Sequence, residues 1–199
     1  MWEDRFANSS DFLFGKDPAR FLAENTSYLT QGARALSVAD GEGRNSVFMA
    51  QHGLSVTALE FAPTAVARAQ SLAAEKDVTV DFQQADVLTR TWENETFDLV
   101  AGLFIQFTGP HGRRKIFDGM KQATCPGGIV MLHGYTPKQL EYGTGGPPFA
   151  ENMYTEVILR AAFVGWDILL CREYDREVQA GSAHSGMSAL IDFIARKPA

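Results

Sequence analysis

A short stretch from Ala35 to Asn45 places the tightest constraint on how this chain can fold. It reads as a buried strand over residues 35–38, a turn containing Gly41-Glu42-Gly43, and a helix that begins at Arg44. Glycine lets the backbone take positive φ angles and approach a ligand closely. The first N–H groups of the helix are unpaired and lie at the positive end of its dipole, where they can bind an anionic or polar group. The stretch therefore predicts a strand–turn–helix unit suited to a nucleotide-like cofactor.

Strand and helix patterns alternate along most of the remaining chain. Strands are expected over 35–38, 54–60, 78–82, 97–104 and 129–135, and helices from Asp17-Pro18, Arg44, Pro63 and Thr108-Gly109-Pro110 and over 152–163. Two last strands, about 167–173 and 188–194, are expected to pair antiparallel. This order predicts a Rossmann-like α/β/α sandwich in one domain, residues 1–199, with its ligand at the carboxyl ends of the strands. Residues 1–30 form an arm and a helix in this prediction.

Composition narrows the class of protein. A net charge of −6 argues against a protein that binds nucleic acid by neutralising many phosphates. Cys125 and Cys171 form no metal-binding or disulfide pattern, so we expect a reducing compartment and no bound metal. No run of eighteen apolar residues is present, and the first residues lack the apolar core of a signal peptide. These features predict a cytoplasmic protein that works without a membrane.

Acidic residues follow two of the expected strands. Glu60 ends the strand after the glycine turn, where a carboxylate can accept both ribose hydroxyls of an adenosine, and Asp86 follows the third strand. Solvated strand-end acids and a turn-forming aspartate are the structural alternatives. A dinucleotide would fit these positions equally well, although the third glycine or alanine of a dinucleotide motif and a second lobe are both missing. A nicotinamide-dependent oxidoreductase therefore stays an alternative.

Several motifs together resemble one family. Residues 35–45, Val56-Thr57-Ala58-Leu59-Glu60 and Cys125-Pro126-Gly127-Gly128 resemble the class I S-adenosylmethionine-dependent methyltransferases. Residues 2–6, the segment 134–147 and His184-Ser185-Gly186 resemble the small bacterial branch related to tellurite-resistance and thiopurine methyltransferases. The resemblance covers essentially the whole chain. It implies a seven-stranded sheet with the last strand antiparallel, and S-adenosylmethionine over the carboxyl ends of the first strands.

The resemblance also assigns roles to residues. Gly41 and Gly43 lie under the methionine part of the cofactor, Glu60 holds the ribose, and Asp86 holds the adenine amino group. The implied cofactor site consists of Ala39, Asp40, Gly41, Arg44, Asn45, Glu60, Phe61, Asp86, Val87 and Phe104. Residues 104–106 border the transferable methyl group, and an arm carrying Trp2, Phe6 and Phe14 closes over the cofactor or straps the outside of the core.

Two positions depart from the family pattern. Ser37 stands where the first strand usually carries an acid, and Ala39 stands where a glycine is usual. The usual acid orients the cofactor's amino group, and Asp40, three residues on, is the candidate substitute. The departures also leave room for a catalytically silent cofactor-binding domain.

Methyl transfer sets modest demands on the acceptor site. A thiolate or a metalloid oxyanion needs no protein base, whereas an amine or hydroxyl does. We expect a small-molecule acceptor, with Tyr135 and His184 as the catalytic candidates and His133 as a strand histidine satisfied by a backbone partner. The loop 143–148 is either a lid or a connector, and residues 113–115 are expected to form a solvated helix face.

Overall fold

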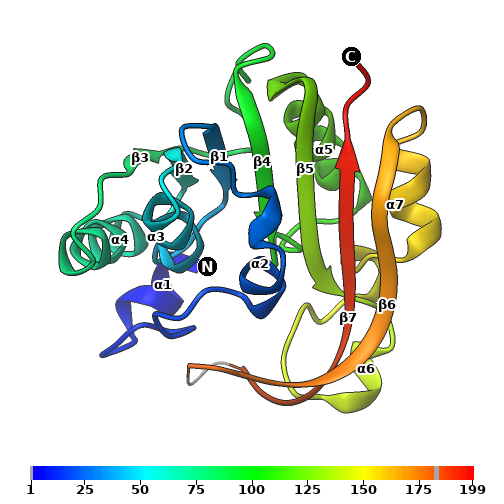
Figure 1. The fold of residues 1–199 in the computed structure, drawn as a ribbon. Coiled ribbons are helices and arrows are strands. Elements are labelled where there is room, and N and C mark those ends of the chain that lie inside the picture. The colour runs from blue at the N-terminus through cyan, green and yellow to red at the C-terminus, as the bar shows by residue number, and fades with distance from the viewer. Residues whose placement is uncertain (1, 182–183) are drawn as a thin grey trace.

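One sheet of seven strands forms the framework of the computed structural model, which describes residues 2–181 and 184–199 without the side chains of residues 180 and 184 (Figure 1). The strands are β1 Arg34–Val38, β2 Ser55–Glu60, β3 Asp81–Gln84, β4 Phe97–Leu103, β5 Thr124–Tyr135, β6 Asp167–Ala180 and β7 His184–Arg196. They lie in the order β3-β2-β1-β4-β5-β7-β6. Strand β7 runs antiparallel to β5 and β6, and the other pairs are parallel. The expected seven-stranded sheet with its last strand antiparallel is confirmed.

Helices cover both faces of this sheet. They are α1 Trp2–Ala7, α2 Arg20–Glu24, α3 Arg44–Gln51, α4 Pro63–Glu75, α5 Pro110–Ala123, α6 Gln139–Tyr142 and α7 Glu156–Ala162, with 3₁₀ turns η1 Thr26–Tyr28 and η2 Ala150–Asn152. Met49 of α3 packs in one apolar cluster with Leu99 of β4, and Phe117 of α5 packs in another with Val100. Neighbouring residues of β4 thus face opposite layers, which is why this strand is apolar throughout. No helix in the described part of the chain is long and apolar enough to cross a membrane.

The first helix of the main fold begins later than the sequence pattern indicates. We expect Asp17 to cap it, but α2 begins at Arg20 with Ala19 at its N-cap. The Ala19 backbone N–H donates instead to Oδ1 of Asn45, 2.9 Å away. This long-range hydrogen bond holds Ala19 in an extended conformation and delays the helix.

The third strand is also displaced. Residues 78–82 are expected to form it, whereas β3 covers Asp81–Gln84. The chain turns at Asp77, with φ 53°, and the Val78 backbone N–H donates to the carbonyl of Ala73 in α4. Val78 and Val80 therefore pack on an apolar cluster that contains Leu72 of α4. These apolar side chains cover the end of α4, and the chain pairs with β2 only from Asp81 onward.

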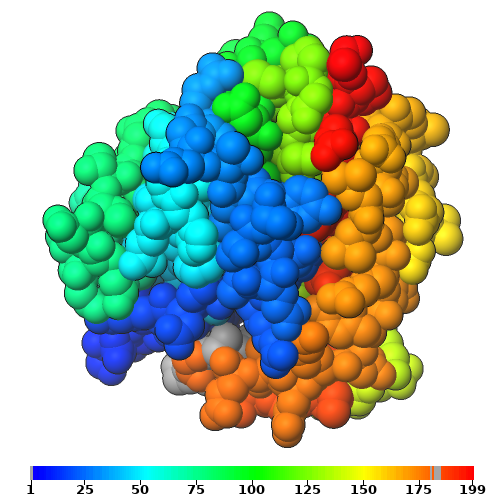
Figure 2. All heavy atoms as spheres, in the orientation of Figure 1, coloured from blue at the N-terminus to red at the C-terminus, as the bar shows by residue number. Residues whose placement is uncertain are grey.

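The last part of the chain has a shorter helix and longer strands than expected. A helix over 152–163 is replaced by the short η2 and by α7, whose N-cap Thr155 accepts from the Ile158 N–H. Strands β6 and β7 form a hairpin several residues longer than the expected 167–173 and 188–194. The hairpin curves away from the sheet toward the N-terminal arm (Figures 1 and 2). A Cβ on Gly181 would lie only 2.4 Å from the Leu13 carbonyl oxygen, so the hairpin end packs closely on the arm.

Candidate functional site

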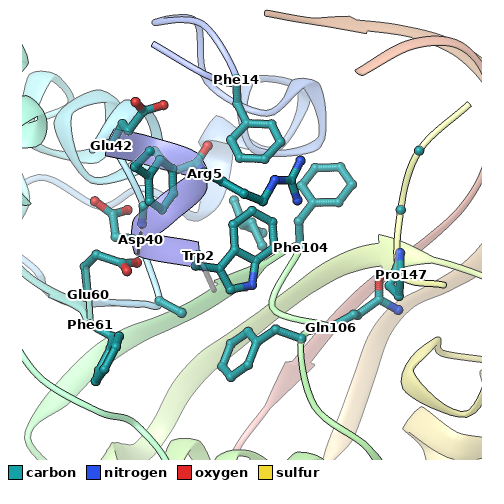
Figure 3. A pocket seen from close by; sticks show the side chains of 18 of the residues that line it. Trp2, Arg5, Phe14, Asp40, Glu42, Glu60, Phe61, Phe104, Gln106 and Pro147 are labelled. Atoms are coloured by element: carbon teal, nitrogen blue, oxygen red, sulfur yellow. Dashed lines mark hydrogen bonds between the residues drawn. The ribbon is translucent and has the colours of Figure 1, made fainter. Parts of the chain in front are cut away.

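A cavity of about 770 Å³ opens at the carboxyl ends of the parallel strands. Its size lies within the range of roughly 300–1,000 Å³ that is typical of small-molecule sites. All ten residues of the cofactor site implied by the resemblance line this cavity: Ala39, Asp40, Gly41, Arg44, Asn45, Glu60, Phe61, Asp86, Val87 and Phe104. Figure 3 shows the carboxylates of Asp40, Glu42 and Glu60 on one side and Gln106 and Pro147 on the other. The cavity therefore has two chemically different halves.

The two glycines of the opening turn have different structural tasks. Both have positive φ, 67° for Gly41 and 88° for Gly43. Gly41 lines the cavity, and a Cβ there would have room. A Cβ on Gly43 would lie 2.7 Å from the Cβ of Ala69 in α4. Gly43 thus lets α4 approach the turn, while Gly41 leaves backbone exposed to a ligand.

The Asp40 carboxylate is hydrogen bonded to Ser37, one of the two residues that depart from the family pattern. Its Oδ1 accepts from the Ser37 hydroxyl at 2.6 Å, and its Oδ2 accepts from the Ser46 hydroxyl at 2.5 Å. Burial raises the pKa of Asp40, and these hydrogen bonds oppose that effect. Ser37 and Asp40 therefore place a buried carboxylate close to the end of β1, although β1 itself carries no acid.

Glu60 ties the ends of β1 and β2 together. One carboxylate oxygen accepts from the Gly41 N–H at 2.8 Å and the other accepts from the Ala62 N–H at 2.9 Å. Burial raises the pKa of Glu60, and the nearby charge of Asp40 raises it further. Perturbed carboxyl groups that share a cavity are a common sign of a functional site.

The N-terminal arm covers the carboxylate half. Trp2, Phe6 and Phe14 line the cavity, and Phe6 also packs against Ala62 and Ala65 of α4. The arm therefore both straps the core and covers the cavity, while its closure over the cofactor stays a prediction.

A partly buried ion pair between Glu42 and Arg68 fastens this arm. The Glu42 carboxylate lies 2.6 Å from Nη1 of Arg68 and accepts from the Leu13 backbone N–H at 2.7 Å. The second Nη of Arg68 donates to the carbonyl of Ser9. The glycine turn, α4 and the arm thus meet at Glu42.

Arg44 contributes a partly buried cation to the cavity. Its guanidinium carbon lies 5.9 Å from the ring centroid of Phe14 and 6.0 Å from that of Phe104, and Nη1 donates to the Phe14 carbonyl at 3.2 Å. Burial lowers the pKa of Arg44 to about 10, and the charges of Asp40 and Glu42 oppose this effect. Arg44 stays charged at neutral pH and suits an anionic group of a ligand.

The other half of the cavity is aromatic and uncharged. Phe104 follows β4 with φ 60°, a conformation that is costly for a large side chain and is found preferentially at functional sites. The Gln106 amide is hydrogen bonded at both ends to the backbone of Tyr135, accepting from its N–H at 2.6 Å and donating to its carbonyl at 2.8 Å. Residues 145–149 complete the wall. The loop 143–148 is therefore part of the cavity, held by the Gln139 side chain, which donates to Thr144 and to the Gly145 carbonyl.

The candidate catalytic residues have different outcomes. Tyr135 lines the aromatic half, where we expect the acceptor. The side chain of His184 lies outside the described residues, so its predicted role stays a prediction. His133 is buried, with Nδ1 2.8 Å from Oδ1 of Asp192 and its ring stacked on Phe21. His133 is thus satisfied, but by a carboxylate on β7 as well as by a backbone carbonyl.

Arg113 corrects the expected solvated face over 113–115. Arg114 and Lys115 are exposed, but Arg113 is partly buried and donates to the carbonyl of Glu151 at 2.6 Å and of Met153 at 3.4 Å. The sequence pattern does not indicate this role, because the carbonyl partners of Arg113 lie about 40 positions further along the chain. Among the residues that the structure describes, no three side chains are grouped as metal ligands.

Comparison with known proteins identifies the central part of the chain. Residues 35–128 match a family model described as a methyltransferase domain. This stretch is a methyltransferase domain. The match confirms the resemblance to the methyltransferases and favours it over the oxidoreductase alternative. It covers the glycine turn, Glu60, Asp86 and Phe104, but neither the arm nor the final hairpin.

Relatives of the methyltransferase domain are distant. A phosphatidylethanolamine N-methyltransferase from Cereibacter sphaeroides is 27% identical over 130 residues, which are 63% of this chain and 63% of that protein. The chain spans 38% of the length of the first curated relatives that it matches, which are uncharacterised mycobacterial proteins. The names of these distant relatives therefore do not define the substrate of this chain.

Solved structures share the fold over nearly the whole chain. A structure described under the conversion of a disulfide bond into a thioacetal group during echinomycin biosynthesis has a TM-score of 0.77 and 20% identity, covering 97% of this chain and 86% of that chain. TehB from Haemophilus influenzae has a TM-score of 0.72 and 17% identity, covering 90% of this chain and 62% of that one. At such identities these structures show the fold alone.

Sequence reasoning missed several residues around the methyltransferase domain's cavity. Glu42 was noted only as part of the glycine turn, Arg68 was not singled out, and Asn152 was noted only at the start of an expected helix. Glu42 and Arg68 meet across 26 positions of sequence, and Asn152 lines the cavity from the short turn η2. No local pattern marks such contacts. An acid placed between two glycines, Gly41-Glu42-Gly43, is the one local signal in the sequence.

Proposed function

We propose that the chain is an S-adenosylmethionine-dependent methyltransferase that acts on a small thiol. The observation that supports this proposal best is the division of one cavity into a carboxylate-bearing half at the ends of β1 and β2 and an uncharged aromatic half beyond β4. When bound, S-adenosylmethionine supplies a sulfonium methyl group that an acceptor attacks in line. The chain's own contribution is to hold donor and acceptor in that line, which can lower the barrier by about 7–11 kcal/mol.

The carboxylate half fits the parts of this cofactor. Each oxygen of Glu60 accepts one backbone N–H and keeps a lone pair, so both ribose hydroxyls have an acceptor. Asp86 uses Oδ1 to accept from the Leu88 N–H, and its other oxygen is available to the adenine amino group. The guanidinium of Arg44 suits the methionine carboxylate, and the Asp40 carboxylate suits the amino group.

The aromatic half favours a thiol as the acceptor. Within the described residues of that half, no histidine, aspartate, glutamate or lysine lines the cavity. A protonated amine needs a base before it can attack, so an acceptor like that of the N-methyltransferase relative is disfavoured. A thiol ionises with a pKa of roughly 8.5 without help, and its thiolate is a strong nucleophile. Rings such as Phe104, Phe107 and Tyr135 suit the apolar body of such a molecule.

A metalloid oxyanion is the second candidate acceptor. Two cations of the described residues line the cavity, Arg5 and Arg44, and the Arg5 guanidinium lies 4.4 Å from the Trp2 ring centroid. Arg5 lies in the arm and is exposed to solvent, and Arg44, at the start of α3, binds the methionine carboxylate in the thiol proposal. We therefore place the thiol first.

Calorimetric titration with S-adenosylhomocysteine tests the cofactor part of the proposal. No binding at millimolar ligand would exclude it. Formation of S-adenosylhomocysteine from S-adenosylmethionine is then measured with thiophenol, tellurite and ethanolamine as acceptors. Turnover of thiophenol alone supports the thiol proposal, turnover of tellurite alone supports the oxyanion, and binding without turnover of any acceptor supports a silent cofactor-binding domain.

The proposal includes a reducing, cytoplasmic location. Cys125 and Cys171 are both free thiols, which suits such a compartment. Localisation of a fluorescent fusion tests this part independently of activity.

A further inference from the structure

Two amide side chains line the aromatic half of the cavity, and they differ in their hydrogen bonding. The Gln106 amide is engaged with the Tyr135 backbone at both ends. Asn152 is 8% exposed and lines the same cavity, and its side-chain amide makes no hydrogen bond to any residue that the structure describes, although its polar atoms are not sealed from solvent. An asparagine amide offers two donors and one acceptor oxygen. An amide that lines the cavity without a protein partner keeps its donors and acceptor for a molecule bound there, so its presence in the wall points to a ligand.

The backbone around Asn152 is fixed on both sides. Arg113 of α5 donates to the carbonyls of Glu151 and Met153, the residues that flank it. The Tyr154 N–H donates to the Tyr135 carbonyl at 3.0 Å, which fastens the same segment to the end of β5. Functional side chains need such support, because a loosely held group cannot select the orientation of a ligand. The unpaired amide is thus held against the same strand end as Tyr135.

The surroundings of Asn152 define the chemistry of its partner. Phe149 precedes it by three residues and is 62% exposed at the cavity wall, and Phe107 is 36% exposed there. Exposed rings of this kind in one cavity suit an apolar, flat molecule. The Asn152 amide both donates and accepts, so the group that matches it most completely is one that does the same, such as another amide.

We propose that Asn152 orients the methyl acceptor, by hydrogen bonding through its amide to a neutral amide-like edge on an aromatic acceptor. This inference rests on the proposed function, because it assigns a role within the acceptor half of that site. Asn152 is a positioning residue: it fixes how the acceptor lies and takes no part in the bond that forms to the methyl group.

A pair of product analogues tests the proposal without requiring turnover. Thioanisole and 4-(methylthio)benzamide carry the same methyl sulfide, and only the second has an amide on its ring. Their dissociation constants are measured by ligand-observed NMR with protein saturated with S-adenosylhomocysteine. We expect the wild type to bind the benzamide about three- to tenfold more tightly, as one neutral hydrogen bond allows. In Asn152→Ala the two ligands should bind equally.

Controls separate positioning from stability. Glu151→Gln changes the neighbouring, exposed side chain of the same turn and should keep the preference. Asn152→Ala should keep the S-adenosylhomocysteine affinity and the unfolding midpoint of the wild type, which a structural role would change. Equal binding by the wild type, a preference that survives in Asn152→Ala, or no binding of either analogue would each overturn the inference. Because S-adenosylhomocysteine binding is measured separately, its absence would instead count against the proposed function.

Discussion

The carboxylate of Glu3 in the N-terminal arm caps helix α4 through Thr64. One Glu3 oxygen accepts from the Thr64 hydroxyl at 2.5 Å and the other accepts from the Thr64 backbone N–H at 3.2 Å. Helix α4 has Ala62 at its N-cap and therefore no side-chain cap of its own. The arm supplies the missing acceptor from 61 positions away. The contact that holds the arm over the cavity therefore also caps α4.

Removing this cap should weaken both stability and cofactor binding. Glu3→Ala is expected to lower the free energy of unfolding by about 0.5–2 kcal/mol, the usual cost of a lost N-cap. S-adenosylhomocysteine affinity should fall too, because Trp2 and Phe6 on the same helix line the cavity. Urea unfolding and calorimetry measure the two effects. In a double-mutant cycle with Thr64→Val, the double variant should lose less than the sum of the single losses; additive losses would contradict the contact.

Ala39 occupies a backbone conformation that favours glycine. Its φ is 49°, in the left-handed region, at the position where the resembled family usually has glycine. For an L residue this conformation costs about 1–2 kcal/mol, and glycine loses part of that gain to chain entropy. We expect Ala39→Gly to raise the free energy of unfolding by up to about 1 kcal/mol.

An alanine with ordinary helical geometry provides the control. Ala50→Gly in α3 should lower the free energy of unfolding by about 1 kcal/mol, the reverse of the change at Ala39. Urea titrations of both variants check the sign. A loss of stability in Ala39→Gly as large as that in Ala50→Gly would show that the positive φ carries no strain.

Glu60 predicts opposite pH trends for stability and for cofactor affinity. Because burial raises its pKa above the ordinary 4.5, the folded protein binds this proton more readily than the unfolded chain does. The stability that the proton adds is complete below pH 4.5 and is lost as pH rises through the raised pKa of the folded state. Ribose hydroxyls instead prefer the ionised carboxylate as acceptor. As the solution is acidified from neutral pH, the affinity for S-adenosylhomocysteine should therefore begin to fall before the pH reaches 4.5.

Substitution of Glu60 isolates its share of this pH dependence. Glu60→Ala should weaken S-adenosylhomocysteine binding at neutral pH by about 1–3 kcal/mol, the loss expected for a charge-assisted partner. Glu60→Gln should give a shallower pH dependence than the wild type, with the remaining slope due to Asp40, whose pKa burial also raises. Calorimetric titrations across the acidic range measure both. An unchanged slope in Glu60→Gln would remove Glu60 from the binding site.

The sequence predicts the parts of this molecule that depend on near neighbours. The turn at Gly41, the acid at Glu60 and the buried strand of β4 were all recognisable, because their patterns are local and their spacing follows from the strand–helix alternation. The start of α2 was wrong because Asn45 holds Ala19 extended, an interaction between two elements. The cap supplied by Glu3 was missed for the same reason. What local patterns cannot give is which distant side chain completes an unsatisfied group.

Arg113 should affect the acceptor half of the cavity without touching the cofactor half. Arg113→Gln removes the guanidinium that holds the carbonyls of Glu151 and Met153, so the turn carrying Asn152 loses one of its two supports. We expect the KM for an aromatic thiol to rise by about three- to tenfold, since a hydrogen bond that is no longer held in place contributes less to binding. S-adenosylhomocysteine affinity should stay at the wild-type value, because Arg113 donates to none of the proposed cofactor-binding residues. Arg114→Gln, one position along the same helix but exposed, is the matched control and should leave both constants unchanged. Equal effects of the two substitutions would mean that net charge, rather than the hold on this turn, sets the affinity for the acceptor.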